Sequence, residues 1–471
     1  MALVGQGDQR TVLLTSKERE SHAHILGTTG EGKSKLIELL IREDIKAGNG
    51  VCFLDPTDRA ETAYNILRYC AKIGHEKVIL IDPHLIHSHN RVCTIQPFNY
   101  KKTYRAASVA SVMDTVRILF QTRDAAETPR IQRYLGAILN VLWAAEMTLH
   151  EAVYFTEYKN SAPRRKEILS HSDPLDRHRL ALEEVFETYY RFNTEFASTV
   201  RRLEPFFDST LDLMFGADKG IDFIKMITEG WVILVNLYSG LGFEPIHTRL
   251  LGTTVINELI FGLDRLRNRG WKGSYYLYVD EAGRYANRNL ADLLAYKRKS
   301  GLRVTVAHQY FNQFEDRVVL DAVKNLTKTK VMFDTPNPSD RLEMIKLLGY
   351  GGEIPRSVAE YANSDLPKQY MILKKPKQNP QKVRVSDVPD VPVTRKQLDD
   401  FIFKLLKHDF YRHPDDIRKE QESRFEGPHT VPPRKRARAD SNPGANPVWD
   451  YQTGGTKAPR KNAGRKTDKE G

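Results

Sequence analysis

The feature that most constrains the fold of this chain is the glycine-rich octapeptide at residues 27–34, which follows an apolar run and precedes helical periodicity. The octapeptide fits the pattern G-x-x-x-x-G-K-[ST]. In this pattern glycines let backbone N–H groups turn onto phosphate oxygens at a helix N-terminus, which itself favours an anion. Lys33 is expected to reach the β- and γ-phosphates, and the Ser34 hydroxyl to ligate Mg²⁺. The sequence therefore predicts a site for ATP and Mg²⁺, formed by Gly27, Thr28, Thr29, Gly30, Glu31, Gly32, Lys33, Ser34 and Lys35.

Short, near-continuous apolar runs recur along the chain and are predicted to be buried strands. Helical periodicity lies between them, which indicates an α/β domain with a mainly parallel sheet covered on both faces. In such a sheet ligands bind at the carboxyl ends of the strands. Gly27, Asp55, Asp82 and Asp280 each directly follow one of these runs, so we expect them on one rim. The runs are residues 22–26, 50–54, 77–81, 231–237, 275–279, 303–307 and 330–333.

An acidic pair, Asp280 and Glu281, ends the run at residues 275–279. At the tip of a strand beside a phosphate loop, Asp280 can hold Mg²⁺, and Glu281 can orient and polarise the water that attacks the γ-phosphate. The same pair could be two solvated acids that open a turn. The phosphate loop earlier in the chain favours the catalytic interpretation.

Two further polar residues flank the next strand. Gln309 follows it, and would lie beside Glu281 as a γ-phosphate sensor if the two strands are neighbours. Arg298 precedes it. Its spacing alone leaves two interpretations open, an arginine finger that acts on the adjacent subunit and a solvated cation favoured by a helix dipole.

The order of these motifs resembles that of the FtsK–HerA class of ring ATPases, and most closely that of the coupling-protein ATPases of conjugation and type IV secretion. The resemblance implies a RecA-like P-loop ATPase core with an all-helical insertion, a homo-oligomeric ring that is a hexamer by analogy, and DNA as the partner. It also implies that Gln309 senses nucleotide and that Arg298 acts across the subunit interface. It rests on residues 27–34, 50–56, 78–83, 96–99, 198–206, 230–237, 275–281 and 298–309.

Composition divides the chain into five expected segments. These are residues 1–103 and 221–376 as the two parts of the ATPase core, 104–220 as the helical insertion, 377–426 as a polar linker with a short helix, and 427–471 as a disordered basic tail. The tail carries half of the net charge of +12 and too little apolar surface to order itself. The remainder is only mildly basic, which permits a nucleic-acid partner without requiring one.

The compartment predicted from the sequence is the cytoplasm. Cys52, Cys70 and Cys93 lie far apart without a C-x-x-C pair, which argues against a zinc or disulfide framework. No apolar stretch reaches the ~20 residues of a membrane span, and the first residues lack a secretory signal. The coupling proteins carry transmembrane helices, so the resemblance implies either a soluble relative or recruitment to the membrane by a separate partner.

The function predicted from these features is that of an ATP-hydrolysing DNA translocase. One alternative is a genome-packaging or protein-secretion motor that a partner complex activates. The other is a nucleotide-gated scaffold without enzymatic activity, which is disfavoured because Lys33, Asp280, Glu281 and Gln309 are all present. The preference for single- or double-stranded DNA and the direction of movement stay open.

Overall fold

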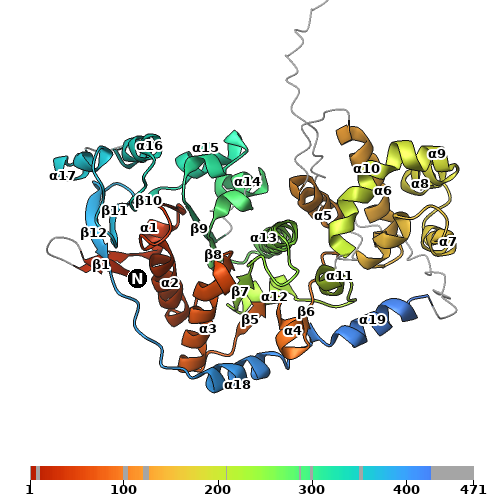
Figure 1. Ribbon diagram of the computed structural model, residues 1–471, viewed down its shortest axis with the longest axis horizontal. Coiled ribbons are helices and arrows are strands. Elements are labelled where there is room, and N and C mark those ends of the chain that lie inside the picture. Colours follow the sequence, from red (N-terminus) through yellow and green to blue (C-terminus); the bar gives the residue numbers. More distant parts are fainter. Residues whose placement is uncertain are drawn as a thin grey trace, which may run out of the picture. The chain divides into compact units, whose positions relative to one another are not determined.

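Seven parallel strands form the larger part of an 11-stranded sheet, in the order β10-β3-β9-β8-β4-β7-β5, with β5 at the edge (Figure 1). The computed structural model describes residues 2–6, 11–98, 104–119, 127–207, 209–285, 288–296, 301–349 and 354–425. All the apolar runs predicted to be strands belong to this parallel set. Nearly every side chain in them is buried, which explains their continuous apolar character. Their bounds are β3 (Ala23–Leu26), β4 (Gly50–Asp55), β5 (Val78–Ile81), β7 (Val232–Asn236), β8 (Tyr275–Val279), β9 (Leu302–His308) and β10 (Thr329–Met332).

Four antiparallel strands extend the sheet beyond β10, in the order β11, β12, β1 and β2. The sequence analysis did not anticipate them. Burial is interrupted by exposed or half-buried positions along β12, so that strand gives no continuous apolar run. The bounds are β11 (Tyr370–Lys374), β12 (Gln381–Val385), β1 (Ala2–Gln6) and β2 (Thr11–Leu14).

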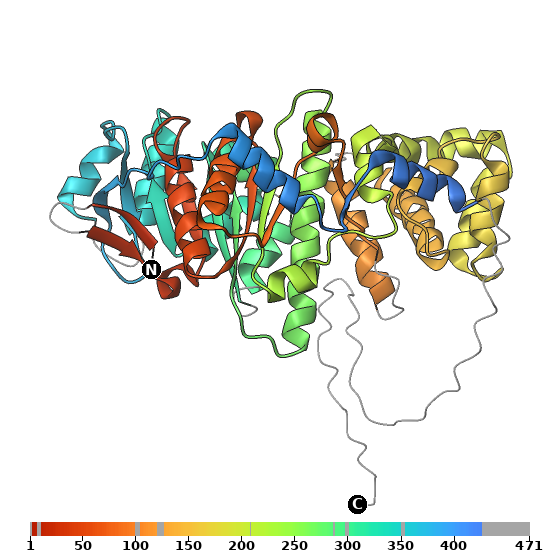
Figure 2. The same ribbon diagram turned by 90° about the horizontal axis from the view of Figure 1, so that it is seen from below.

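Helices cover both faces of the sheet, which completes the predicted α/β architecture (Figures 1 and 2). On one face lie α2 (Lys33–Lys46), α3 (Glu61–Ile73) and α18 (Arg395–Leu405); on the other lie α14 (Arg288–Tyr296) and α15 (Arg317–Leu326). The long helix α13 (Pro245–Asn268) follows β7. Among the described helices, none combines the length and apolar character that crossing a bilayer requires.

Between β6 (Val92–Cys93) and β7, the described residues form helices and no strand. The packed interior of this stretch includes Tyr134, Phe155 and Phe196, all fully buried. Helical structure was expected here, whereas the division of the chain into domains stays a prediction. The α-helices are α5 (Arg105–Leu119), α6 (Glu127–Ala144), α7 (Ala162–Ser170), α8 (Arg177–Phe186), α9 (Tyr189–Arg191), α10 (Ala197–Leu203), α11 (Ser209–Phe215) and α12 (Phe223–Thr228).

The last described stretch, residues 394–425, connects the sheet to the helical stretch, and we call it the strap. It contains α18, β13 (Tyr411–Arg412), which pairs with β6, and α19 (Pro414–Ser423). The Tyr411 hydroxyl accepts from the Leu80 N–H at 2.7 Å and donates to the Leu80 carbonyl at 3.1 Å, on β5, the edge strand of the sheet. Arg424 pairs with the fully buried Glu151 and, at 2.6 Å, with Asp218. The strap therefore links the sheet, at β5, to the helical stretch between β6 and β7. The predicted tail at 427–471 lies outside the described residues.

Candidate nucleotide-binding site

Backbone hydrogen bonds connect the loop between β3 and α2 to the chain at the ends of both strands that flank β3. The Gly27 N–H donates to the His308 carbonyl on β9 at 3.2 Å, and the Thr28 N–H donates to the Asp334 carbonyl just after β10 at 3.0 Å. Gly27 also packs tightly, because a Cβ there would lie 2.4 Å from the Cβ of Phe333. Both neighbouring strands therefore fix where the loop begins.

The second half of the loop depends on backbone conformations that suit glycine. Gly30 has φ +87° and Gly32 has φ +121°, and L side chains rarely adopt either value. Gly32 is the N-cap of α2, so the loop leads directly into the helix N-terminus. Backbone N–H groups of the first helical turn are thereby left free for an anion, as the octapeptide pattern predicts.

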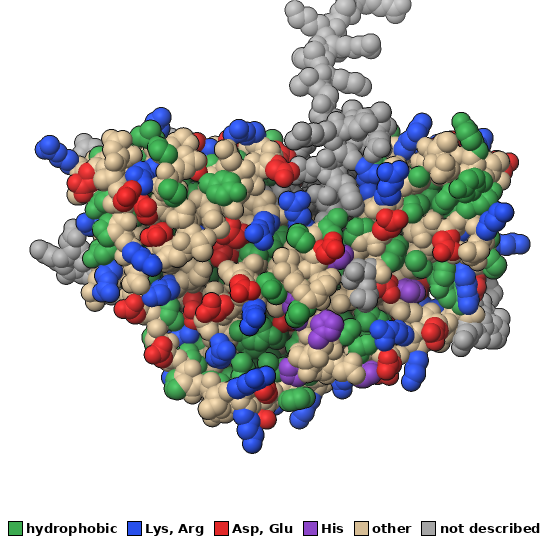
Figure 3. Space-filling view, in the orientation of Figure 1, with side chains coloured by type: hydrophobic (Ala, Val, Ile, Leu, Met, Phe, Trp, Pro, Cys, Tyr) green, Lys and Arg blue, Asp and Glu red, His purple; other side chains and the backbone are tan. Residues whose placement is uncertain are grey.

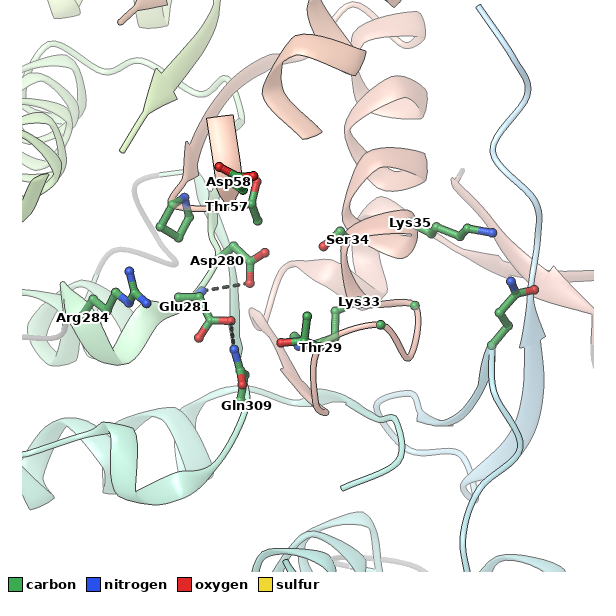
Figure 4. A pocket seen from close by; sticks show the side chains of 14 residues that line it. Thr29, Lys33, Ser34, Lys35, Thr57, Asp58, Asp280, Glu281, Arg284 and Gln309 are labelled. Carbon is green, nitrogen blue, oxygen red and sulfur yellow. Dashed lines mark hydrogen bonds between the residues drawn. The ribbon is translucent and has the colours of Figure 1, made fainter. Parts of the chain in front are cut away.

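A pocket of about 410 Å³ opens at this loop (Figure 4). It lies at the carboxyl ends of the parallel strands, where the topology predicts a ligand. Contributions come from the loop, the ends of β4 and β8, the end of β9, and the residue that precedes β11. The lining residues are Thr29, Gly30, Gly32, Lys33, Ser34, Lys35, Pro56, Thr57, Asp58, Asp280, Glu281, Arg284, Gln309 and Gln369.

Lys33 begins α2 and is almost completely buried at this pocket. Its Nζ donates to the Thr28 carbonyl at 3.0 Å. Burial lowers the pKa of Lys33, and the nearby charges of Asp280 and Glu281 oppose that change. The Lys33 ammonium can donate hydrogen bonds to phosphate oxygens as it does to the Thr28 carbonyl. The hydrogen bonds to phosphate would be stronger, because the phosphate oxygens are negatively charged.

Asp280 directly follows β8 and is 2% exposed. Burial, and next the charge of Glu281, raise the pKa of Asp280 to about 7, while Lys33 opposes the shift. A divalent cation would favour the ionised form, and the Ser34 hydroxyl in the same pocket is a second oxygen ligand of the kind Mg²⁺ prefers. Among the described residues, no group of three or more His, Cys, Asp or Glu could hold a metal. Asp280 and Ser34 are oxygen ligands that this pocket could offer to Mg²⁺, which usually keeps several water ligands and binds substrate phosphates.

Glu281 has a strained backbone and a side chain held at both oxygens. Its φ of 47° and ψ of 45° are left-handed, a conformation that costs energy for a residue other than glycine. The Gln309 Nε2 donates to Oε1 at 2.7 Å (Figure 4), and the Gln313 Nε2 donates to Oε2 at 2.8 Å. The two amides therefore fix the carboxylate in one orientation at the pocket.

Gln313 also positions Gln309, and the sequence analysis missed it. It ends the short 3-10 helix η8 (Phe311–Gln313), and its Oε1 accepts from the Gln309 N–H at 2.7 Å. Arg284 and Gln369 line the pocket without having been predicted. The spacing of four residues from Gln309 to Gln313 was visible, but it carries no motif that would have singled it out.

The structure brings most of the predicted residues together. Gly27, Thr28 and Glu31 are the loop members that do not line the pocket; the Glu31 backbone carbonyl accepts from the Gln369 N–H at 3.2 Å. Asp55 accepts from the N–H groups of Thr57 and Ala63, which makes it a strand-end turn residue. The predicted residues in the pocket are Thr29, Gly30, Gly32, Lys33, Ser34, Lys35, Asp280, Glu281 and Gln309, whereas Arg298 lies outside the described residues.

A strand, a glycine loop with its lysine, and an acidic pair at the tip of a nearby parallel strand define the P-loop NTPase fold. No protein-family model and no curated protein matches the sequence. The fold is similar to that of the bacterial conjugative coupling protein TrwB in an unbound form, with a TM-score of 0.54, 16% identity, and coverage of 82% of this chain and 90% of that one.

Two further solved structures share the fold. TrwB in complex with ADP and Mg²⁺ has a TM-score of 0.54 and 16% identity, over 80% of this chain and 88% of that one. VirB4 of Thermoanaerobacter pseudethanolicus has a TM-score of 0.53 and 15% identity, over 82% of this chain and 96% of that one. The predicted α/β fold with a P-loop core is confirmed, and the resemblance stated from the sequence holds at the level of the fold.

Proposed function

We propose that this chain is an ATPase that couples ATP hydrolysis to the movement of DNA. The observation that carries the proposal is the convergence of Lys33, Asp280, Glu281 and Gln309 on one pocket, with both carboxylate oxygens of Glu281 held by amides. The solved structure of TrwB with ADP and Mg²⁺, which shares the fold, supports the choice of nucleotide and metal.

Each residue has a separate task in the proposed hydrolysis. Lys33 and the backbone of the glycine loop bind the phosphates, and Ser34 with Asp280 would hold Mg²⁺, which supplies charge neutralisation at the phosphate oxygens. Glu281 orients the attacking water and accepts its proton, because its carboxylate is fixed at the pocket. The Gln309 side chain donates a hydrogen bond to this carboxylate, and Gln309 directly follows β9. Loss of the γ-phosphate on hydrolysis would therefore be transmitted from Glu281 through Gln309 to the end of β9.

Movement of DNA is proposed to require an oligomeric ring, a hexamer on the family resemblance. Figure 3 shows Lys and Arg intermixed with Asp and Glu over the visible face, rather than gathered in one basic patch. We assign DNA contact to Lys and Arg on loops that would face the pore of such a ring, with an affinity that falls steeply in salt. Arg298 is proposed to complete the neighbour's site. A membrane-anchored secretion or packaging complex would recruit this cytoplasmic ring.

The test is steady-state ATP hydrolysis by the full chain without DNA, with single-stranded DNA and with duplex DNA. Stimulation by one form of DNA, abolished in Glu281→Gln, is the expected result. Glu315→Gln is the matched control, because the Glu315 side chain is 59% exposed and does not line the pocket. Hydrolysis that neither DNA changes would favour a partner-activated packaging or secretion motor. Turnover equal to that of Glu281→Gln would indicate a scaffold.

A further inference from the structure

The nucleotide pocket has two walls that differ in charge (Figure 4). The glycine loop and the start of α2 form one wall, which carries Lys33 and Lys35. The residues that follow β4 and β8 form the other, which carries the carboxylates of Asp58, Asp280 and Glu281. We call this second side the acidic wall. Because the phosphates of ATP are negatively charged, a cation on the acidic wall would favour their binding.

Among the described lining residues of the acidic wall, Arg284 is the one with a cationic side chain. It ends the short 3-10 helix η6 (Ala282–Arg284), for which Glu281 is the N-cap. The Arg284 N–H donates to the Glu281 carbonyl at 2.9 Å, so a single turn of backbone joins the two residues. The turn that brings Glu281 to the pocket therefore brings Arg284 to the same wall (Figure 4).

Both chain neighbours of Arg284 are fixed by close packing. A Cβ on Gly283 would lie 2.6 Å from the Cβ of Gln313, so η6 lies directly against the residue that holds Glu281. On the other side Tyr285 is fully buried, and a Cβ on Gly252 of α13 would lie 2.9 Å from its ring. The backbone of Arg284 is thus held in place at the pocket, while its side chain is exposed.

The Arg284 guanidinium is available to a ligand. In the described part of the chain, no hydrogen bond or salt bridge engages this side chain. The carboxylate of Glu281, one turn earlier, is held instead by the neutral amides of Gln309 and Gln313. A guanidinium offers a planar fork of N–H donors, which matches the oxygens of a phosphate group.

We propose that Arg284 binds the γ-phosphate of ATP in the site of its own subunit. The inference rests on the proposed function, because the role given to Glu281 places the γ-phosphate between Lys33 and the acidic wall. Arg284 would then neutralise charge on the terminal phosphate from the side opposite Lys33. Its task differs from that proposed for Arg298, which is to complete the site of the neighbouring subunit.

The experiment is isothermal titration calorimetry of the full chain with Mg²⁺ and either ADP or its non-hydrolysable triphosphate analogue ADPNP. The two ligands differ by the γ-phosphate, and neither requires hydrolysis or DNA. Arg284→Ala should weaken the binding of ADPNP about 10- to 100-fold, because charge-assisted hydrogen bonds are lost, and should change that of ADP by less than about twofold. Arg284→Lys should recover part of the loss, since it keeps the charge without the fork. A purely structural role of Arg284 would weaken both ligands alike.

Arg59→Ala is the matched control. Arg59 directly follows Asp58 of the acidic wall, but it is exposed and does not line the pocket. Its loss should leave the affinities for both ligands unchanged. A selective loss of ADPNP binding in Arg59→Ala equal to that in Arg284→Ala would trace the effect to the general charge of this side and overturn the proposal.

A mixture of Arg284→Ala chains with Lys33→Ala chains tests whether Arg284 acts in its own site. Turnover of ATP in the mixture should not exceed that of the two variants measured apart, because each variant lacks a residue of its own site. An increase on mixing would place Arg284 in the neighbour's site and would contradict the proposal.

The calorimetry also separates this inference from the proposed function. Equal affinity of the wild type and Arg284→Ala for ADPNP would overturn the inference alone. A wild-type chain that binds neither ADP nor ADPNP would overturn the proposed function, and the role of Arg284 with it.

Discussion

Gln313 offers a sharp test of how the proposed general base is positioned. Gln313→Leu removes the amide that donates to Glu281 Oε2 at 2.8 Å, and it leaves the Gln309 N–H without its acceptor. A hydrogen bond to a charged group contributes about 1.5–3 kcal/mol. Because the base must hold its orientation in the transition state, kcat for ATP should fall roughly 10- to 100-fold. The KM for ATP should change little, since Gln313 does not line the pocket.

The assay is steady-state ATP hydrolysis with the form of DNA that stimulates it. Asn312→Leu is the matched control, because Asn312 is the exposed neighbour of Gln313 in η8. If Gln313 acts through Glu281, adding Gln313→Leu to Glu281→Gln should cause little further loss. A kcat for Gln313→Leu equal to that of wild type, or full additivity in the double variant, would refute the reasoning.

Other predictions concern stability, measured as the free energy of unfolding in urea. Gly27→Ala should destabilise by about 1–3 kcal/mol, because the new Cβ would lie 2.4 Å from that of Phe333. Gly136→Ala in α6 should instead stabilise by about 0.5–1 kcal/mol, since nothing lies within 4 Å of a Cβ there. Burial raises the pKa of Glu258 from 4.5 to about 8. The folded chain then keeps this proton after the unfolded chain has lost it, so stability should fall between those pH values by up to about 1.4 kcal/mol per pH unit. Arg424→Met should cost about 3–5 kcal/mol, because it leaves a fully buried carboxylate unpaired.

Each of these stability predictions has its own check. Equal effects of Gly27→Ala and Gly136→Ala would contradict the packing argument. Glu258→Gln should flatten the pH dependence, and an unchanged slope would assign it to other groups. Arg424→Met combined with Glu151→Leu should recover part of the loss, and no recovery would show that the ion pair is not its cause.

The parallel part of the sheet and the phosphate loop could be predicted because each is encoded by a short, contiguous stretch of sequence. A strand buried on both faces is a continuous apolar run, and the phosphate loop is one contiguous octapeptide. The order of those runs placed Asp280 and Glu281 correctly at the edge that carries the loop. By contrast, β12 interrupts its buried positions with exposed ones inside a polar stretch, and nothing local showed that it would pair with β1 and β11.

The rest of the site depends on tertiary geometry. Gln313 reaches Glu281 only because Glu281 adopts a left-handed turn and a single 3-10 turn folds the chain back after Gln309. Gln369 enters the pocket from the residue before β11, which sits beside β10 in the sheet. No spacing in the sequence encodes either approach. The roles of the site residues stay predictions until they are measured.

The position of β3 has a consequence for synthesis of the chain. Its two neighbours, β9 and β10, begin at Leu302 and Thr329, whereas β3 itself begins at Ala23. A ribosome adds about 5–20 residues per second, so the phosphate-loop strand waits roughly 15–60 seconds for partners on either side. During that interval an apolar strand and its glycine loop have no sheet to join, and the nascent chain has no formed nucleotide pocket. Nucleotide can therefore stabilise this protein only late in its synthesis, and until then the unpaired early strand is exposed to aggregation.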